Sequence, residues 1–177
     1  MSQFAGSIAS SPGRRLFLWY MSACLGGGLL LAQPVCRNPS AAPISLVDGV
    51  FTATSACCVT GLSVRSTAND FSFVGQAVIL LWVQIGGIGI MTLTTFLMLT
   101  VGGQETLRQH SAMASTIGSK MGDDLRGILL RVAFITIGME LVGAALLTAR
   151  YLFDLPWTEA LWQGVFHSIA AFCNAGF

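Results

Sequence analysis

One stretch of this chain occurs twice, and neither copy is long enough to cross a membrane. Residues 49–62 (GVFTATSACCVTGL) and residues 164–177 (GVFHSIAAFCNAGF) align at a shift of 115 positions, with six of fourteen residues identical. An internal repeat constrains the whole architecture, because each copy belongs to one repeated structural unit. A spanning helix needs about 20 apolar residues, whereas an apolar stretch of about 10 to 14 is typical of a re-entrant or buried segment.

Each copy has the pattern of a short helix that ends before a glycine. Residues 49–58 are compatible with a helix, and the sequence Val59-Thr60-Gly61 indicates an exit into extended backbone. Non-helical backbone at membrane depth is tolerated only inside protein or along a water-filled path. We therefore predict that each copy is a re-entrant pore helix followed by a pore loop.

The composition is that of a membrane protein. Hydrophobic residues make up 54% of the chain and charged residues 10%, whereas soluble domains carry roughly 25% charged residues. The formal net charge of +1 gives no reason to expect a nucleic-acid partner. Two histidines and five cysteines show no metal-ligand spacing. We expect the cysteines to be small core residues and expect no covalently bound cofactor.

Three long runs are uncharged or nearly so: residues 16–35, 71–104 and 132–149, the last broken only by Glu140. They predict an all-α polytopic membrane protein with three spanning helices and two re-entrant pore helices. The helices would form tandem helix–pore-helix–helix repeats, one complete and one incomplete. The predicted divisions are a cytoplasmic N-terminal tail (1–13), the first repeat (14–101), a cytoplasmic connector (102–127) and an incomplete second repeat that ends in its filter (128–177).

Basic residues predict the orientation. They precede the first apolar run or gather in and beside the connector, as Arg14, Arg15, Arg108, Lys120, Arg126 and Arg131. Because cytoplasmic loops are enriched in Lys and Arg, the N-terminus and the connector are expected in the cytoplasm. Both pore loops then enter from outside a cell membrane that the chain crosses several times.

The repeated glycine fits a cation path. Backbone carbonyls can replace the hydration shell of a cation in a narrow pore. Glycine adopts the unusual backbone angles this requires at little steric cost, and Gly61 and Gly176 occupy the same place in both copies. The C-terminal end of each preceding helix is partially negative and favours a cation. The nearest carboxylates, Asp48 and Glu159, lie well before the glycines, so no acidic ring is predicted.

Residues 48–64, 73–76 (FVGQ), 84–92 (QIGGIGIMT) and 166–177 resemble the Trk/Ktr/HKT family of potassium transporters, especially the Ktr-type membrane subunit. The resemblance implies four such repeats in one chain, each donating one filter segment to a central path. It implies that K⁺ is the substrate and that the filter glycines favour K⁺ over Na⁺. The first filter segment would be Val59, Thr60, Gly61 and Leu62, and the second Asn174, Ala175, Gly176 and Phe177.

The same resemblance implies partners. Family members work with a cytoplasmic nucleotide-binding regulatory subunit, and we expect the complete protein to be a homo-oligomer in the lipid bilayer. Four repeats at a spacing of 115 residues would need more than twice these 177 residues. The gating loop that members carry in the third repeat has no counterpart here. We therefore expect the N-terminal part of a transporter, which would not conduct alone.

Two polar residues inside apolar runs, Glu140 and Gln84, are predicted to support the structure by hydrogen bonding between helices. His167 is expected to be packed and hydrogen-bonded on the second pore helix. An accessory or assembly membrane protein without transport is the alternative, although it does not explain the repeated glycine-ended loop. An enzyme is not favoured, because the histidines, cysteines and Glu140 do not cluster in sequence.

Overall fold

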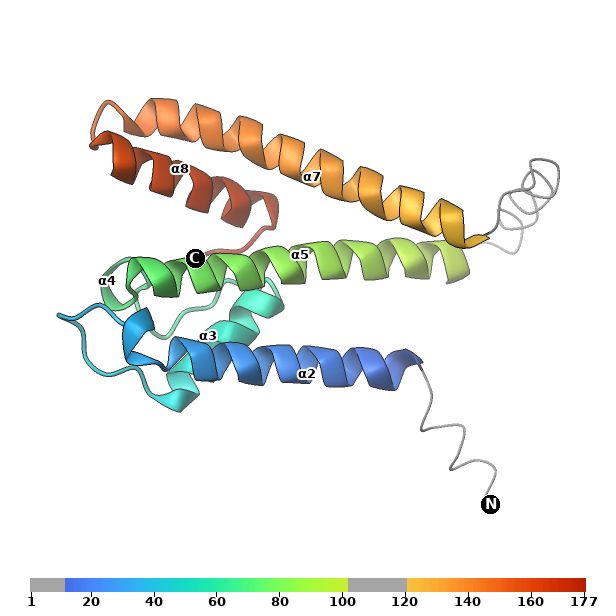
Figure 1. Cartoon of the computed structure of the whole chain (residues 1–177), viewed down its shortest axis with the longest axis horizontal. Helices are drawn as coiled ribbons and strands as arrows, with labels where there is room; N and C mark the ends of the chain where they lie inside the picture. Colours follow the sequence, from blue (N-terminus) through green and yellow to red (C-terminus); the bar gives the residue numbers. More distant parts are fainter. Residues whose placement is uncertain (1–11, 102–120) are drawn as a thin grey trace, which may run out of the picture. The chain divides into compact units, whose positions relative to one another are not determined.

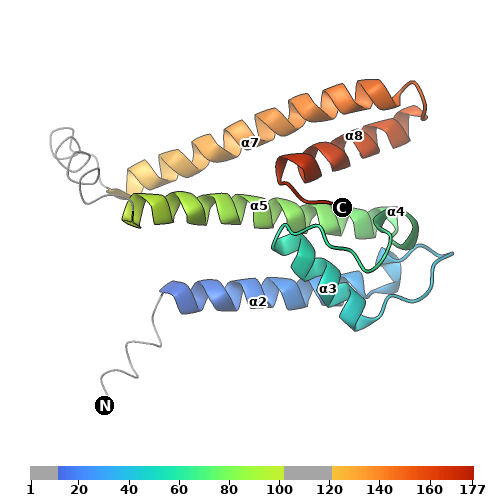
Figure 2. The same cartoon turned by 180° about the vertical axis from the view of Figure 1, so that it is seen from behind.

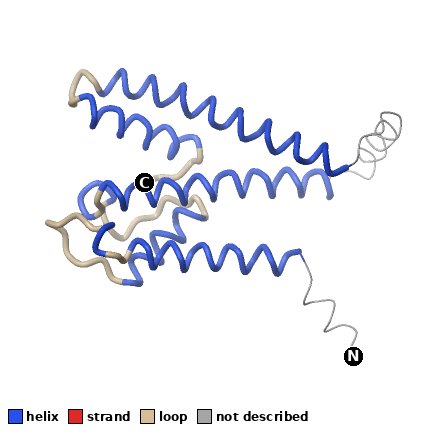
Figure 3. The backbone as a smooth tube through the Cα atoms, in the orientation of Figure 1, coloured by secondary structure: helices blue, strands red, loops and turns tan. Residues whose placement is uncertain are grey.

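The computed structural model describes residues 12–101 and 121–177, and their regular structure is helical (Figures 1 and 3). Within these ranges the β structure is limited to one isolated bridge between Arg37 and Phe71. The prediction of an all-α chain is therefore confirmed. The elements are α2 (Pro12–Leu31), the 3-10 turn η1 (Pro34–Cys36), α3 (Leu46–Cys57), α4 (Thr67–Asp70), α5 (Phe73–Val101), α7 (Met121–Tyr151) and α8 (Trp157–Phe172).

The fold divides into two units. The described residues up to Gly86, together with Cys173–Phe177, form the first unit, and the described residues of Gly87–Phe172 form the second. The last five residues thus belong with the N-terminal helices although α8 does not. This division places both predicted filter segments in the first unit.

In the first unit, α2 and α3 cross with their backbones almost in contact, as the views from both sides show (Figures 1 and 2). A Cβ atom built on Gly49 would lie 2.6 Å from the Gly28 carbonyl oxygen, and one built on Gly28 would lie 2.6 Å from the Val50 Cα. Small residues let helices approach this closely where lipid gives no hydrophobic drive. Gly28 lies at this close contact, while Gly26 has open space beside it.

The segments on either side of α3 are tied together by hydrogen bonds. Asn38 donates its backbone N–H to the Asp70 carbonyl at 2.9 Å and its side-chain amide to the Asn69 carbonyl at 3.0 Å. Ser72 donates its backbone N–H to Cys36 at 2.9 Å. The loop after α2 and the turn before α5 are therefore held against each other, which fixes where α3 starts and where the chain returns.

The second unit contains the pair α7 and α8, joined by a short turn (Figure 2). Gly164 of α8 faces the Thr148 side chain of α7, and a Cβ there would lie 3.0 Å from the Ala144 carbonyl oxygen. Gly164 is the residue that the 115-residue shift pairs with Gly49. In each unit, then, the same glycine of the repeated stretch allows a short helix to lie directly on the backbone of the preceding long helix.

Two described helices contain segments long and apolar enough to span a membrane: Phe73–Ile90, with mean hydropathy 1.8, and Leu130–Tyr151, with mean hydropathy 1.9. The apolar part of α2, Phe17–Leu31, is shorter, so the third spanning helix stays a prediction. α2 ends at Leu31, and Pro34 starts the η1 turn. Proline cannot donate the backbone hydrogen bond that a continuing helix needs.

Parts of two predicted segments, residues 1–11 of the tail and 102–120 of the connector, lie outside the described residues. The last part of the predicted connector is helical, because α7 begins at Met121. α3 also begins earlier than the repeated stretch, at Leu46. Its start is fixed by Ser45 and Asp48, which form a reciprocal capping box and satisfy two backbone donors.

Candidate functional site

Both copies of the repeated stretch end their helices in the same way. α3 ends at Cys57 and α8 at Phe172, positions that the 115-residue shift superimposes. Two residues later the backbone turns left-handed, with φ of 57° at Val59 and 59° at Asn174. The predicted exit from the helix is confirmed for both copies. The turn occurs two residues before the glycine rather than at it.

The hydrogen bonds of the first turn are those of a Schellman motif. Val59 donates its N–H to the Ala56 carbonyl at 3.1 Å, and Thr60 donates its N–H to the Ser55 carbonyl at 2.9 Å. These two bonds satisfy carbonyls that the end of a helix otherwise leaves open. The motif requires a left-handed residue at the position of Val59, where glycine is usual and asparagine the common second choice. The second copy has asparagine there, but the first has a β-branched residue.

Valine in this conformation is strained, because its branched Cβ crowds the neighbouring carbonyl oxygen. Its φ of 57° lies in the left-handed region, which costs an L-residue roughly 1–2 kcal/mol. Strain of this kind persists only where surrounding contacts over-determine the conformation, and it gathers at functional positions. The first predicted filter segment therefore begins with a strained residue.

The two repeated glycines lie against each other. A Cβ built on Gly61 would overlap the backbone nitrogen of Gly176, would lie 2.5 Å from the Gly176 Cα and would lie 3.1 Å from the Ala175 carbonyl carbon. Gly61 also has φ of 69°, in the left-handed region. Two independent reasons thus exclude a side chain at Gly61. The structure brings together segments that lie 115 residues apart in the sequence.

The two glycines are not equivalent. The φ of Gly176 lies outside the left-handed region, and a Cβ there would lie 3.6 Å from the Gly61 oxygen, an ordinary van der Waals distance. The expectation that both glycines supply an unusual backbone angle therefore holds for Gly61 and not for Gly176. Of the other predicted filter residues, Ala175 is buried, Val59 and Phe177 are half-buried, and Thr60, Leu62 and Asn174 are exposed. Their assignment as ion-binding residues stays a prediction.

The first part of α5 contacts both copies just before their turns. A Cβ on Gly86 would overlap the carbonyl oxygen of Cys57, the last residue of α3, and would lie 2.7 Å from its carbonyl carbon. Cys173, next to Asn174, donates its thiol to the Gln84 side-chain oxygen at 3.9 Å. The QIGGIG motif therefore begins where α5 touches the chain ahead of both predicted filter segments. Gln84 thus contacts a residue 89 positions away in the chain, and its predicted role in hydrogen bonding between helices stays a prediction.

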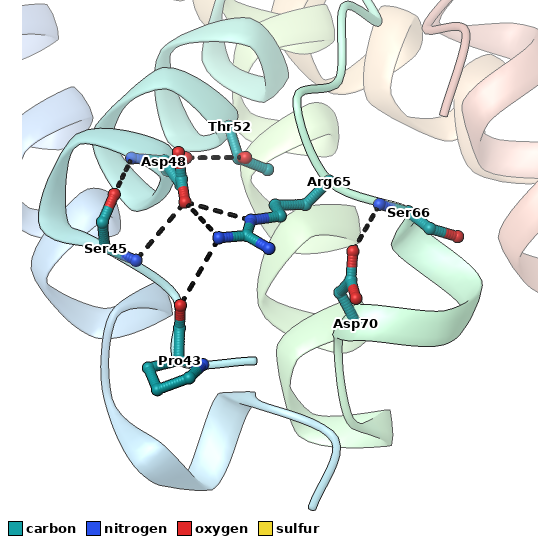
Figure 4. Close-up of polar contacts among 7 residues, drawn as sticks. All are labelled: Pro43, Ser45, Asp48, Thr52, Arg65, Ser66 and Asp70. Carbon is teal, nitrogen blue, oxygen red and sulfur yellow. Dashed lines mark hydrogen bonds and ion pairs between the residues drawn. The ribbon is translucent and has the colours of Figure 1, made fainter. Parts of the chain in front are cut away.

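An ion pair between Asp48 and Arg65 lies at the N-terminal end of α3 (Figure 4). The Asp48 Oδ2 atom accepts hydrogen bonds from Arg65 Nε at 3.0 Å and from Arg65 Nη2 at 2.9 Å, and Arg65 Nη2 also lies 3.5 Å from the Pro43 carbonyl. The Ser45 N–H donates to the same carboxylate at 3.4 Å. Arg65 follows the first predicted filter segment, so this ion pair ties the end of that segment to the start of its helix.

The ion pair also lowers the pKa of Asp48. The Arg65 guanidinium hydrogen-bonded to Asp48, with further help from Ser45, holds the pKa of the Asp48 carboxyl below its usual value of 3.8. Asp48 precedes the repeated apolar stretch and lies outside the predicted spanning helices. The sequence did not predict this ion pair, because no local rule relates residues 17 positions apart. The sequence does contain a Ser45-x-x-Asp48 capping pattern, which is typical of a helix start.

In the second unit, the predicted supporting residue Glu140 lies at the contact of α7 with α8. It is 7% exposed, and its backbone carbonyl accepts a hydrogen bond from Ser168 Oγ at 2.7 Å. Gly143, one turn further along α7, faces the same serine side chain. The supporting role of the Glu140 carboxylate itself stays a prediction. His167 is exposed, with Nδ1 2.9 Å from the Gln163 carbonyl of its own helix, so it is hydrogen-bonded but not packed in a core.

The cysteines are mostly core residues, as predicted: Cys24, Cys36, Cys57 and Cys173 are buried, and Cys58 is exposed. Among residues 12–101 and 121–177, no group of three or more His, Cys, Asp or Glu side chains could hold a metal ion. The two glycine segments in contact offer backbone carbonyl groups, and Thr60 offers a hydroxyl group.

Two helices long and apolar enough to cross a membrane, and two short helices that each end before a glycine, fit a membrane protein of the cation-transport class. Residues 30–177 match TrkH, described as a cation transport protein. The chain belongs to this family, as its motifs indicated.

Named relatives agree with this. The Ktr system potassium uptake protein B of Vibrio alginolyticus is 34% identical over 164 residues, which cover 93% of this chain and 35% of that protein. The Ktr system potassium uptake protein D of Bacillus subtilis (strain 168) is 33% identical over 171 residues, which cover 96% of this chain and 38% of that protein. The chain thus spans little more than a third of the length of these relatives.

Proposed function

We propose that the chain forms part of a membrane-embedded potassium uptake transporter, in which K⁺ passes between backbone carbonyls of the two glycine segments. The observation that carries the proposal is the contact of Gly61 with Gly176, because two loops that share a narrow path must meet at the path. The family and the names of the relatives support transport of a cation and K⁺ as that cation. Backbone carbonyls are suited to this task, since they replace the hydration shell without a fixed charge.

The proposed architecture is a tandem array of helix–pore-helix–helix repeats. In the first repeat α2 is the outer helix, α3 the pore helix and α5 the return helix. In the second, α7 and α8 take the places of α2 and α3. Matching helix ends at Cys57 and Phe172 and matching glycine contacts at Gly49 and Gly164 support this correspondence. The N-terminus is proposed to lie in the cytoplasm, and the relatives' designation as Ktr systems supports a separate regulatory subunit.

The filter residues are proposed to act through their main chain: Val59, Thr60, Gly61 and Leu62 in one segment and Asn174, Ala175, Gly176 and Phe177 in the other. K⁺ is the transported substrate rather than a resident cofactor. Each segment follows the C-terminal end of a helix, α3 or α8. That end is partially negative, which would favour a cation.

The test compares two glycines that differ in surroundings. The full open reading frame is expressed in a bacterial strain without its own K⁺ uptake, as Gly61→Ser, Gly176→Ser and Gly26→Ser. We expect rescue of growth at low K⁺ by the unsubstituted protein, and a fall of about tenfold in the K⁺-to-Na⁺ uptake ratio for Gly61→Ser, equivalent to about 1.4 kcal/mol. The effect at Gly176 should be smaller, because a Cβ there has room.

Gly26→Ser is the control, since a Cβ at Gly26 meets nothing within 4 Å. Uptake is compared at equal membrane abundance. An unchanged ratio in Gly61→Ser, or no rescue by the unsubstituted protein despite its presence in the membrane, contradicts the proposal.

A further inference from the structure

The first filter segment is fastened to its pore helix by a pair of hydroxyl groups. Ser55 Oγ and Thr60 Oγ1 lie 3.0 Å apart, and Thr60 Oγ1 lies 3.3 Å from the Ser55 carbonyl oxygen. The same carbonyl accepts the Thr60 N–H at 2.9 Å. Ser55 is 4% exposed, so its hydroxyl is enclosed by protein.

The protons of these two hydroxyls fit one arrangement. If Thr60 donates its hydroxyl proton to the Ser55 carbonyl, the Ser55 hydroxyl is the donor in the hydrogen bond between the two hydroxyls. Each hydroxyl then donates one hydrogen bond, so both O–H groups have an acceptor. The Thr60 side chain is held on the pore helix by both contacts, which fixes the residue whose own carbonyl precedes Gly61.

The second copy lacks both hydroxyls. The 115-residue shift pairs Ser55 with Ala170 and Thr60 with Ala175, and both alanines are buried, at 4% and 6% exposure. A buried hydroxyl that loses its partner is costly, whereas replacing both partners by apolar groups can be nearly neutral. The two hydroxyls are therefore present together in one copy and absent together in the other, as a functional pair would be.

We propose that Ser55 is a positioning residue for the first filter segment. Its hydroxyl holds Thr60 against α3 and thereby directs the Thr60 carbonyl, so that the first segment is braced more firmly than the second. This role rests on the proposed function, because it concerns a carbonyl of the proposed ion path. Ser55 itself does not contact the ion.

The experiment uses the full open reading frame with Ser55→Ala, Thr60→Val and the double variant. For Ser55→Ala we expect the K⁺-to-Na⁺ uptake ratio to fall about fivefold, with a raised KM for K⁺ and a nearly unchanged maximal rate. A factor of five corresponds to about 1 kcal/mol, the typical net worth of one hydrogen bond. The double variant should fall no further than the worse single variant, because all three remove one shared interaction.

Thr52→Val is the matched control. Thr52 is as buried as Ser55, but its hydroxyl donates to the Asp48 carbonyl of its own helix at 2.8 Å and not to the filter segment. Thr52→Val should leave the ratio unchanged. An unchanged ratio in Ser55→Ala, an equal fall in Thr52→Val, or additive losses in the double variant would overturn the proposal.

A second measurement applies if Ser55→Ala is poorly abundant. K⁺ that binds the folded protein raises its thermal midpoint, so purified variants are compared in equal concentrations of K⁺ and Na⁺. The excess stabilisation by K⁺ should be smaller in Ser55→Ala than in Thr52→Val, and equal values contradict the proposal. Gly61→Ser separates the two ideas: if the filter is misplaced its ratio is also unchanged, whereas if only the brace is wrong its ratio still falls.

Discussion

At the scale of single residues, the two copies of the repeated stretch form the same left-handed turn with different side chains. Val59 and Asn174 have nearly the same φ, 57° and 59°. Asparagine tolerates this conformation because its short polar side chain can hydrogen-bond locally, whereas valine cannot. The first copy therefore keeps a strained residue where the second has a relaxed one, next to the segment that is braced by Ser55.

Exchange of the two side chains should change stability in opposite directions. We expect Val59→Asn to stabilise the protein by about 1 kcal/mol through relief of left-handed strain, and Asn174→Val to destabilise it by a similar amount. The thermal midpoint of the purified full-length protein in detergent measures both. A lower midpoint for Val59→Asn would show that contacts of the valine side chain outweigh its strain.

At the scale of elements, two features hold α3, the proposed pore helix. Its start carries the ion pair of Asp48 with Arg65, and its end lies on α5 at Gly86. The helix and the segment that follows it are thus fixed at both ends by residues outside the repeated stretch. Substitutions should be poorly tolerated at Asp48, Arg65 and Gly86, and well tolerated at a glycine with open space beside it, such as Gly26.

The ion pair predicts a pH dependence. The pKa of Asp48 is lowered on folding, so its contribution to stability is present above the unfolded value, near 3.8, and is lost as pH falls through the lower folded value. The unsubstituted protein should therefore lose thermal stability below about pH 4 more steeply than Asp48→Asn. Thermal unfolding in detergent from pH 3 to 6 measures this, and parallel curves for the two proteins would exclude a contribution from Asp48.

The contact of Gly86 predicts a steric effect. A methyl group at Gly86 would meet the Cys57 carbonyl, and such overpacking costs about 1–3 kcal/mol. We expect Gly86→Ala to lower the thermal midpoint, while Gly26→Ala, in open space, should keep or raise it because alanine favours a helix. Equal midpoints for the two variants would mean that α5 moves aside at no cost.

Much of this arrangement was predictable from the sequence. The repeat located both short helices and their ends, and composition predicted an all-helical membrane protein. The unusual backbone angle of Gly61 was predicted, because glycine is the default for positive φ. The left-handed conformation of Val59 was not predicted, because the backbone hydrogen bonds of the Schellman motif impose it on a valine. The pairing of Asp48 with Arg65 and the contact of Gly61 with Gly176 depend on tertiary packing, which no local pattern encodes.

At the scale of the whole molecule, the proposed topology places the loops around α3 outside the cell. Asn38 and Asn69 lie on the same side, since the Asn38 side-chain amide donates to the Asn69 carbonyl at 3.0 Å. The positive-inside rule puts the stretch around Gln109, which lies outside the described residues, in the cytoplasm.

A labelling experiment tests this topology. A membrane-impermeant maleimide added to intact cells should label Ala42→Cys and Ala68→Cys, both exposed in the structure, above the level of the unsubstituted protein. Gln109→Cys should be labelled only after the cells are opened. External labelling of Gln109→Cys, or protection of the other two, would invert the orientation.

The contact between Gly61 and Gly176 also orders the events of biosynthesis. A nascent chain that has not yet reached Gly176 can form α3 and its Schellman turn, since these bonds are local, but its Gly61 has no backbone to lie against. The contact requires that the chain between Gly61 and Gly176 close into a loop, and loop closure lowers the conformational entropy of the chain. The first glycine loop therefore reaches its final surroundings only after a second, separate part of the chain has been translated.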